Sequence, residues 1–450
     1  MTLRASLLRE LDNSGLSVDR HAEVCCDLAR DFENTGEYEA ARRALRDYWR
    51  RIGEQPKLSG LEETTAAEVL LRAGVLTGYV GSKNQIEEAQ ENAKDLITQS
   101  QAIFEARSNK KKIAEAHTEL ALIYWRTGEN NEARDLLTEA LSLLSIDNDL
   151  KAKAVIRLAV VEFRAARHEK ALRILRRHKR LFDKIQNHTL KGSYHDTLAN
   201  ALEDLSFLKK RAEYVDLALI EYAVARLHFE KAGHNFYLAA LENNLGMLYF
   251  RINRHDEAHE HLDLARRIFT SLKEVSLVGQ VDDTRASVFL KQGRIAEAEK
   301  AARAAVRIQE KTSRHGLVAE ALTTLGRALA RLERYGAALS AFQRAITLYE
   351  RLDCMKRAAE VALAMVQEMR EHLTASEHGQ LLSGRGVVQD KLTLEHNVIK
   401  LALIRAKGRV SEAASLAGMS WQGLAYALQT RHKDLLKYRT PVKRRRKRKP

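Results

Sequence analysis

Apolar residues recur along most of this chain at the three- and four-residue spacing of one face of an α-helix. The pattern itself repeats, most regularly between residues 240 and 345, where one alanine returns every 40 residues. This anchor alanine is found at Ala40, Ala89, Ala133, Ala171, Ala218, Ala258, Ala298 and Ala338. A period of this length predicts a solenoid of stacked helix pairs rather than a domain with one central core.

Small residues also stand at fixed distances from the anchor alanine. Seven residues after it come Ala140, Ala225, Ala265, Ala305 and Ala345, and twelve before it come Ala121, Ala159, Gly246, Ala286 and Gly326. Small side chains let two antiparallel helices approach closely. With the aromatic and bulky residues between them, this order resembles the tetratricopeptide repeat (TPR) over about residues 20 to 372. The repeats are near 40 residues long, against about 34 in the family, and the family's proline near the repeat end is absent.

The resemblance implies an all-α protein whose TPR-like α-solenoid contains about eight helix pairs. Composition agrees, because the three prolines (Pro56, Pro441 and Pro450) leave residues 61 to 372 without a helix breaker. Alternating β-branched runs between hairpin turns are missing, so no sheet is expected. We therefore expect the solenoid, with N- and C-terminal capping helices, to span residues 1–373.

No signal-peptide core and no apolar run of membrane-spanning length occurs in the sequence. The three cysteines are an adjacent pair, Cys25 and Cys26, and the distant Cys354, which do not form a disulfide framework. We expect a soluble cytoplasmic protein with no membrane partner.

The net charge of +15 is concentrated at the C-terminus. From Glu395 to Pro450 there are 15 Lys and Arg against three Asp and Glu, which leaves only +3 for the preceding residues. Such asymmetry predicts an acidic polymer as the partner of this end. Residues 374–391, rich in Gly and Ser, are expected to be a hinge, residues 392–440 a small helical domain, and residues 441–450 a disordered basic tail.

The small domain has the pattern of three short helices. The first, over about 394–406, has an apolar surface wider than one helix pair needs, which predicts a homodimer. Ser411 is placed to cap the second helix, and Gly418 to form a sharp turn. Ser420 is placed to cap the third helix, which Leu424 and Leu428 hold on the core. The sequence thus predicts a helix-turn-helix.

These residues resemble the C-terminal DNA-binding domain of the Fis family, whose third helix enters the major groove. Carried over, the resemblance implies that double-stranded DNA contacts Ser411, Ser420, Trp421, Gln422, Ala425, Tyr426 and Gln429. This chain departs from the family's usual residues at three positions. It has Trp421 where the family has a basic or polar residue, Gly423 where the family has Thr, and Tyr426 where the family has Arg. A helix-turn-helix kept only as a packing module is the alternative.

Basic residues follow the third helix and end the chain. We expect them to contact phosphates, which carry no sequence information; a localisation signal or a role in solubility are alternatives for the tail. The residues are Arg431, Lys433, Lys443, Arg444, Arg445, Arg446, Lys447, Arg448 and Lys449.

Within the solenoid, a basic residue stands seven positions before the anchor alanine in six successive repeats. One interpretation is a basic track along a groove that binds a peptide or protein; the other is that each cation neutralises the dipole at its own helix end. Asn243 and Asn244 are candidates for binding a peptide backbone, since an amide both donates and accepts hydrogen bonds. The basic residues are Arg126, Arg164, Arg211, Arg251, Lys291 and Arg331.

No phosphate-binding loop, catalytic triad or paired-carboxylate motif stands out. His255 and His259 have the spacing of metal ligands on a helix but lack a third ligand. We therefore expect no catalytic residues, no metal and no cofactor. The sequence favours a nucleoid-associated, DNA-binding transcriptional regulator whose solenoid senses a peptide or protein. The alternative is a non-catalytic TPR scaffold tethered by its basic end to RNA, the ribosome or another acidic surface.

Overall fold

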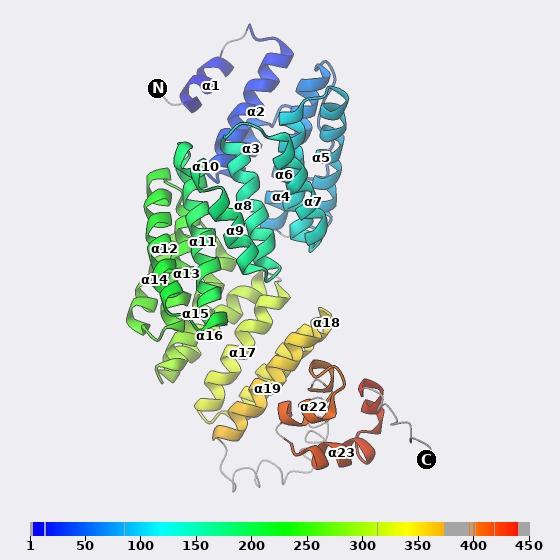
Figure 1. Ribbon diagram of the computed structural model, residues 1–450, viewed down its shortest axis with the longest axis vertical. Coiled ribbons are helices and arrows are strands. Elements are labelled where there is room, and N and C mark those ends of the chain that lie inside the picture. The colour runs from blue at the N-terminus through cyan, green and yellow to red at the C-terminus, as the bar shows by residue number, and fades with distance from the viewer. Residues whose placement is uncertain are drawn as a thin grey trace, which may run out of the picture. The chain divides into compact units, whose positions relative to one another are not determined.

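The computed structural model describes residues 3–12, 15–84, 86–312, 314–372, 396, 399–400, 402–417 and 419–439. Every regular element in these ranges is a helix, as Figure 1 shows, so the expected all-α solenoid is confirmed. The chain divides into two compact units, an N-terminal unit of Met1–Leu245 and a C-terminal unit of Gly246–Pro450. The sequence did not predict this division.

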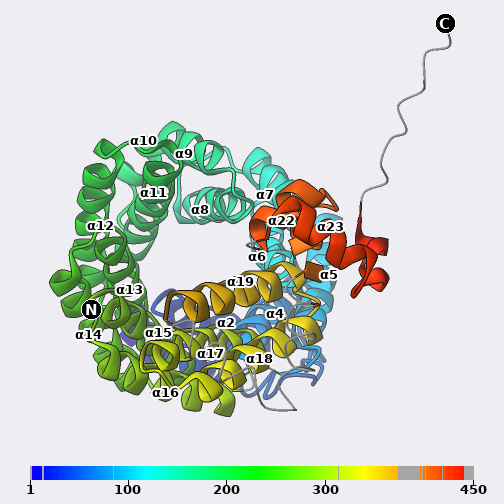
Figure 2. The same ribbon diagram turned by 90° about the horizontal axis from the view of Figure 1, so that it is seen from below.

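The N-terminal unit consists of antiparallel helix pairs that follow one another in an arc. In Figure 2, α8 and α11 lie on the inside of this arc and α9 and α12 on the outside. The helices are α1 (Leu3–Leu11), α2 (Val18–Asn34), α3 (Tyr38–Ala44), α4 (Glu63–Asn84), α5 (Ala89–Ala106), α6 (Lys110–Thr127), α7 (Asn130–Leu143), α8 (Asp149–Arg164), α9 (His168–Arg177), α10 (Lys179–Lys184), α11 (His188–Lys209), α12 (Glu213–Ala232) and the start of α13 (Asn235–Arg251).

Polar caps define where the inner helices of this unit begin. Asn109, Asn148 and Asn187 precede α6, α8 and α11, and each side chain accepts a backbone N–H three residues on, at 3.2, 2.9 and 3.1 Å. These bonds satisfy amides that have no partner within the helix. The inner α6 ends at Gly128 and the outer α12 at Gly233, whose φ values of 92° and 64° suit glycine.

The anchor alanines lie where the sequence expects them, with one exception. In the first pair the fully buried residue is Ala41, and Ala40 is half-buried. The prediction is therefore one residue out at α3, whose single short stretch carries too little periodicity to fix the register. The buried anchors are Ala89, Ala133, Ala171, Ala218, Ala258, Ala298 and Ala338.

The beginning and the end of the N-terminal unit touch. Gly36, in the turn between α2 and α3, has a φ of 77°, and a Cβ built there would lie 3.0 Å from Cε1 of His234. His234 immediately precedes α13. The positive φ and this close approach both favour glycine at the turn between α2 and α3.

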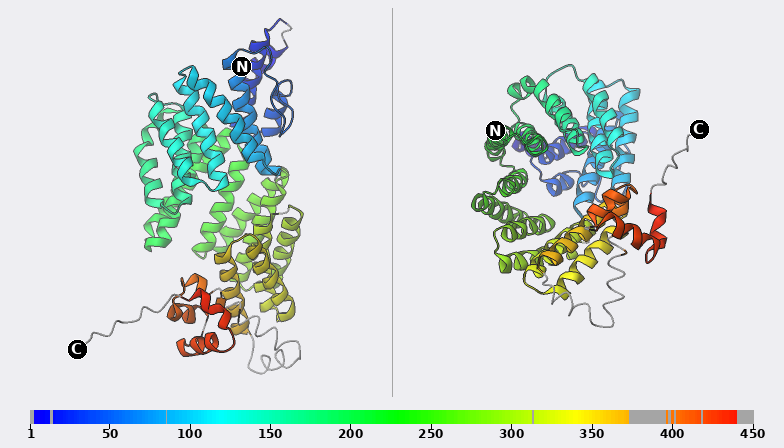
Figure 3. Two further views of the ribbon diagram at one scale, coloured as in Figure 1. Left: turned by 90° about the vertical axis from the view of Figure 1, so that its right-hand side faces the viewer. Right: turned by 60° about the horizontal axis from the view of Figure 1, so that its bottom comes forward.

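The C-terminal unit continues with more regular pairs, which Figure 3 shows packed side by side. Helix α19 follows the last pair and packs on α17 and α18. The helices are α14 (His255–Ser271), α15 (Val275–Lys291), α16 (Ile295–Lys311), α17 (His315–Arg331), α18 (Tyr335–Arg351) and α19 (Met355–His372), followed by α22 (Val410–Leu416), α23 (Trp421–Gln429) and the 3₁₀ helix η1 (Lys433–Tyr438).

The turns inside these regular pairs share one conformation. Asn253, Gly293 and Glu333 occupy the same position and have φ values of 61°, 74° and 59°. In all three turns the next residue donates its backbone N–H to the carbonyl five residues earlier, at 2.9 Å. This is a left-handed helix ending, which leaves the chain ready to start the next helix.

The last helices pack around Ile399, Leu403, Leu424, Leu428 and Leu435. The predicted cap of α23 is confirmed, because the Ser420 hydroxyl accepts the Gly423 N–H at 3.0 Å. The predicted cap of α22 is wrong: this helix begins at Val410, so Ser411 lies inside its first turn.

Several predictions fall on parts of the chain without described positions. Gly418, the hinge at 374–391, five positions of the first helix (394, 395, 397, 398 and 401) and the tail at 441–450 lie outside the described residues. Among the helices that are described, none is long and apolar enough to cross a membrane.

Candidate functional site

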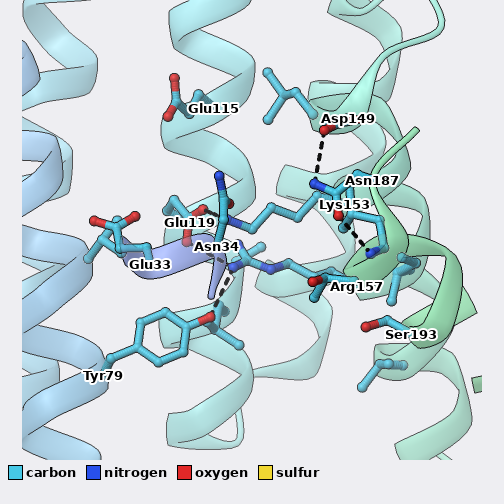
Figure 4. Close-up of a pocket in the computed structure, with 18 of the residues that line it drawn as sticks. Glu33, Asn34, Tyr79, Glu115, Glu119, Asp149, Lys153, Arg157, Asn187 and Ser193 are labelled. Atoms are coloured by element: carbon cyan, nitrogen blue, oxygen red, sulfur yellow. Dashed lines mark hydrogen bonds and ion pairs between the residues drawn. The ribbon is translucent and has the colours of Figure 1, made fainter. Parts of the chain in front are cut away.

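A pocket of about 580 Å³ opens between the inner helices of the N-terminal unit. Its walls come from α2, α4, α6, α8, α11 and the start of α13, and most of the side chains in Figure 4 are charged or polar. The lining includes Glu33, Arg72, Tyr79, Glu119, Lys153, Arg157, Asn187 and Asp196.

One wall is a network of buried charges around Arg72, whose side chain is 1% exposed. The Arg72 guanidinium lies 2.6 Å from a carboxylate oxygen of Glu33 and 2.6 Å from one of Glu115. Glu68, one turn before Arg72 on α4, is 3.5 Å away. Burial acts to raise the pKa of Glu115, but Arg72 and Lys112 outweigh it and lower that pKa to about 2.

A second charged cluster lies between α6 and α8. Glu119 accepts hydrogen bonds from Lys153 at 2.6 Å and from Arg157 at 2.9 Å, and Arg157 also reaches the Tyr79 hydroxyl at 3.4 Å, as Figure 4 shows. Burial disfavours the charge of Glu119, but the two cations outweigh burial and hold its pKa below the ordinary range. Glu115 and Glu119 are therefore charged at neutral pH, whereas burial raises the pKa of Glu33.

At the far end of the pocket lies Asp196, whose pKa is raised, unlike the pKa values of Glu115 and Glu119. Burial raises the pKa of Asp196 to about 6, although amides of Asn244 and Asn200 favour its charged form. The Asn244 amide donates to it at 3.5 Å, and no ion pair to Asp196 is found among the described residues. Next to this end, His234 stacks on Tyr237 with ring centroids 4.1 Å apart, and burial lowers the pKa of His234 to about 4.

The pocket thus offers acids, bases, amides and aromatic faces. Such a surface suits a polar ligand that carries groups of both signs, because acceptors, cations and amides line the same pocket. No group of three or more metal-ligating side chains is found in the described part of the chain.

Most residues of the predicted basic track lie at helix ends or contact other side chains of the chain. Five of its six members lie in the last turn of an inner helix, but Arg211 does not, because α11 ends at Lys209. That prediction was wrong for Arg211: α11 ends at a left-handed residue, Lys210, and Arg211 pairs with Glu213 instead. The other members are Arg126, Arg164, Arg251, Lys291 and Arg331.

Contacts of the track show what these cations stabilise. Arg331 donates to the carbonyl of Leu290 at 3.0 Å, at the end of α15, and also contacts Glu368. Arg126 lies over the ring of Tyr79, 4.4 Å from its centroid. None of the six lines the pocket, whereas Asn244 reaches it through Asp196. Asn243 is half-buried.

Helix α23 separates its residues into two faces. Leu424 and Leu428 are buried, while Trp421 and Tyr426 are 57% and 62% exposed. The predicted DNA contacts lie on the accessible face: Ser420, Gln422 and Gln429 are exposed and Ala425 is half-buried.

The remaining predicted DNA contacts are divided between described and undescribed parts of the chain. Ser411, Arg431 and Lys433 are exposed. The seven bases from Lys443 to Lys449 lie outside the described residues. In their described parts, the last helices therefore present hydroxyl, amide, aromatic and basic groups to solvent.

The charged pocket was missed by sequence reasoning, although a local signal was present. Glu68 and Arg72 stand four residues apart within the otherwise apolar stretch from Ala66 to Val75. Charges in such a run are costly to bury unless they are paired. That cost could have identified α4 as the wall of a polar site, but not the partners on other helices.

Two stretches of the chain, residues 112–184 and 278–351, match the family model of the tetratricopeptide repeat. The chain contains tetratricopeptide repeats. In a sequence comparison with curated proteins, nothing matches.

Several solved structures share the repeat architecture at low sequence identity. A Rap protein complexed with Competence and Sporulation Factor has a TM-score of 0.53 at 14% identity, covering 84% of this chain and 100% of the other. Aspartyl phosphate phosphatase F from Bacillus subtilis has a TM-score of 0.51 at 12% identity, covering 87% and 96%. A signal transduction ATPase with a tetratricopeptide repeat sensor, from Pyrococcus horikoshii, has a TM-score of 0.51 at 17% identity, covering 80% of this chain and 54% of the other. These likenesses establish the fold.

Proposed function

We propose that this protein is a non-enzymatic, DNA-binding transcriptional regulator whose N-terminal unit binds a peptide or a flexible segment of a partner protein. The observation that carries the proposal is the division of α23 into a buried leucine face and an exposed face with Trp421, Gln422 and Tyr426. Trp421 and Tyr426 are 57% and 62% exposed, so most of their surface is open to a partner.

The chemistry of the exposed face suits the edges of base pairs. Gln422 has an amide that matches the donor and acceptor of adenine in the major groove. Trp421 and Tyr426 offer apolar surface for a thymine methyl group. Arg431 and Lys433, exposed beyond the helix, supply charge for phosphates.

The pocket supports the ligand half of the proposal. A peptide backbone alternates donors and acceptors, and its side chains and termini carry both signs of charge, as do Glu119, Lys153 and Arg157 at the pocket. The Rap protein of similar fold was crystallised with Competence and Sporulation Factor, which agrees with a binding role for such a solenoid.

The DNA half is tested by titrating the full chain with its preferred duplex and with a scrambled duplex at two salt concentrations, the preferred duplex being selected first from a random pool. We expect Gln422→Ala to weaken binding to the preferred duplex by about 1–3 kcal/mol and to leave the scrambled duplex and the salt dependence unchanged. Gln186→Ala, an exposed change in the N-terminal unit, is the control.

Replacing the bases from Lys443 to Lys449 with Gln gives the complementary result. All duplexes should then bind more weakly, and the salt dependence should flatten by a slope of about 0.9 for each phosphate that the tail no longer neutralises. If no duplex is preferred, and Gln422→Ala, Trp421→Ala and Tyr426→Ala have no effect, α23 does not read bases. The scaffold tethered to an acidic surface then replaces the regulator.

The ligand half is tested by panning a displayed random-peptide library on the full chain. Selected peptides should bind Arg157→Met at least ten-fold more weakly and bind Arg327→Met, a change outside the pocket, with unchanged affinity. Selected peptides that bind both variants equally would place the binding surface elsewhere.

A further inference from the structure

Helix α12 of the N-terminal unit is apolar on both sides. Its inner side is buried through Ala218, Tyr222, Ala225 and Phe229. Its outer side faces away from α11, on the outside of the arc in Figures 1 and 2. On that side Leu217, Ile220 and Leu227 are 41%, 58% and 48% exposed, and Val224 beside them is half-buried.

The other repeats do not share this outer surface. Counted from the anchor alanine, the four positions of α14 hold Glu257, Glu260, Leu264 and Arg267. In α16 they hold Glu297, Lys300, Ala304 and Arg307. The repeat therefore does not require apolar residues there, and three exposed large side chains in one stripe mark an interaction surface.

The spacing identifies the kind of partner. Leu217, Ile220, Val224 and Leu227 follow one another at intervals of three, four and three residues. This is the a and d spacing of a helix that packs along a second helix, with each side chain seated between those of the partner. We call these four residues, with Glu213 and Lys231 at their ends, the α12 seam.

The α12 seam is symmetric about residue 222. Leu217 and Leu227 lie five residues on either side of it, and Ile220 and Val224 lie two residues on either side. At the ends, the acid Glu213 and the base Lys231 lie nine residues on either side. An antiparallel copy would therefore place leucine on leucine, isoleucine on valine and glutamate on lysine.

We propose that the α12 seam is the interface of a homodimer in which two copies of α12 pack antiparallel across a two-fold axis. Such an axis brings the same patch of both subunits together, so every contact occurs twice. The charge at the two ends selects this arrangement, because parallel copies would oppose Glu213 to Glu213 and Lys231 to Lys231. Both end residues are exposed, and Glu213 pairs within its own subunit with Arg211.

The residues beside the α12 seam are compatible with a second helix. Ala223, next to the centre, is small and exposed, which lets the two helices approach. The neighbouring acids already have partners: Glu221 lies 2.5 Å from the ring of His195, and Glu230 lies 3.0 Å from Arg226. The charge of Glu230 is thus partly neutralised before a second subunit arrives.

The length of the seam sets the strength of the dimer. From Glu213 to Lys231 the helix rises about 27 Å at about 1.5 Å per residue. One helix pair of this length covers less than the area of about 1,200 Å² found in standard stable interfaces. We therefore expect a reversible dimer whose population changes with protein concentration.

Sedimentation of the full chain over a range of concentrations tests this interface. We expect a monomer–dimer equilibrium whose dissociation constant rises at least ten-fold in Ile220→Glu, because each substitution enters two layers of the interface. Leu208→Glu, at a residue 67% exposed on α11, is the matched control and should leave the constant unchanged. Circular dichroism of both variants checks that these surface changes leave the fold intact.

Charge reversal tests the antiparallel arrangement. Glu213→Lys and Lys231→Glu should each weaken the homodimer, and the double variant should recover it. A chain that stays monomeric throughout, or a dimer that Ile220→Glu leaves unchanged, overturns the interface. A dimer sensitive to Ile220→Glu but not to either single charge reversal overturns the antiparallel arrangement.

Discussion

Helices α4 and α6 of the N-terminal unit bury more charged side chains than α17 of the C-terminal unit. In the N-terminal unit, α4 and α6 bury Glu68, Arg72 and Glu119, whereas in the C-terminal unit α17 buries mainly alanine and leucine. The anchor alanines are unevenly spaced in the first case and 40 residues apart in the second. This contrast indicates that the repeat period alone builds a scaffold, and that a site forms where the repeat departs from its own rule.

The largest effect on stability is expected from a substitution that breaks the charge network of the N-terminal unit. Arg72→Met removes a buried cation and leaves Glu33, Glu68 and Glu115 without it, which should destabilise this unit by about 3–5 kcal/mol. Urea unfolding measures the loss. In a Trp421→Phe background, fluorescence reports this unit alone, because Trp49 and Trp125 are then the remaining tryptophans.

Arg327→Met in the C-terminal unit is the comparison for this change, and because neither Trp49 nor Trp125 lies in that unit, its unfolding is followed by circular dichroism. The Arg327 side chain is 45% exposed and 4.0 Å from Glu368, so the free energy of unfolding should change by less than about 1 kcal/mol. Equal losses in the two variants would contradict the contrast between the units.

A smaller effect tests close packing in the regular repeats. A Cβ at Gly326 would lie 2.9 Å from ring atoms of the buried Phe342. Gly326→Ala should therefore lower the free energy of unfolding by about 1–2 kcal/mol, despite the better helix propensity of alanine. Gly336→Ala, where nothing lies within 4 Å of the new Cβ, should gain about 0.5–1 kcal/mol. The comparison is made by thermal unfolding followed by circular dichroism.

A pH series compares one carboxylate from each unit. Burial raises the pKa of Asp196 and of Asp283 to about 6, against about 3.9 in an unfolded chain. Their neutral form is favoured in the folded state, so the stability this provides is complete below about pH 4 and is lost as pH rises through 6.

Asp196→Asn and Asp283→Asn should each remove this loss of stability at high pH, because an amide does not ionise. We expect a gain in the free energy of unfolding of about 1 kcal/mol at pH 7, reduced for partial exposure, and a smaller gain at pH 5. Chemical unfolding at the two pH values measures it. A gain that grows toward low pH would show that these carboxylates are charged and paired in the folded state.

The smallest effect concerns the shared turn of the regular pairs. Glu333 has the left-handed conformation that Gly293 adopts without strain in the preceding repeat. Glu333→Gly should raise the free energy of unfolding by about 0.5 kcal/mol, since relief of strain exceeds the added flexibility of the unfolded chain. Gly293→Ala should lower the free energy of unfolding. Thermal unfolding of the two variants measures the gain in one and the loss in the other.

The sequence predicted the pairs of helices better than the site. The anchor alanines and the two faces of α23 follow from which residues share one side of a helix, and helical periodicity is local. The predicted anchor position was wrong at α3, and the predicted helix end was wrong at Arg211. Both lie in short or irregular segments, which contain few repeats of the helical pattern. The candidate track of bases was found by spacing, yet Arg331 reaches a carbonyl and a carboxylate on neighbouring helices.

The repeated helix pair and the small residues on which it closes can be read from the sequence alone, because both depend on contacts a few residues or one repeat apart. The folded chain was needed to show that Arg72 meets Glu33 and Glu115, and that Gly36 touches His234. These contacts depend on how much each pair turns relative to the last, and this rotation is set by packing along the whole unit. The same holds for α12, whose apolar residues are evident in the sequence, while their exposure is a property of the assembled fold.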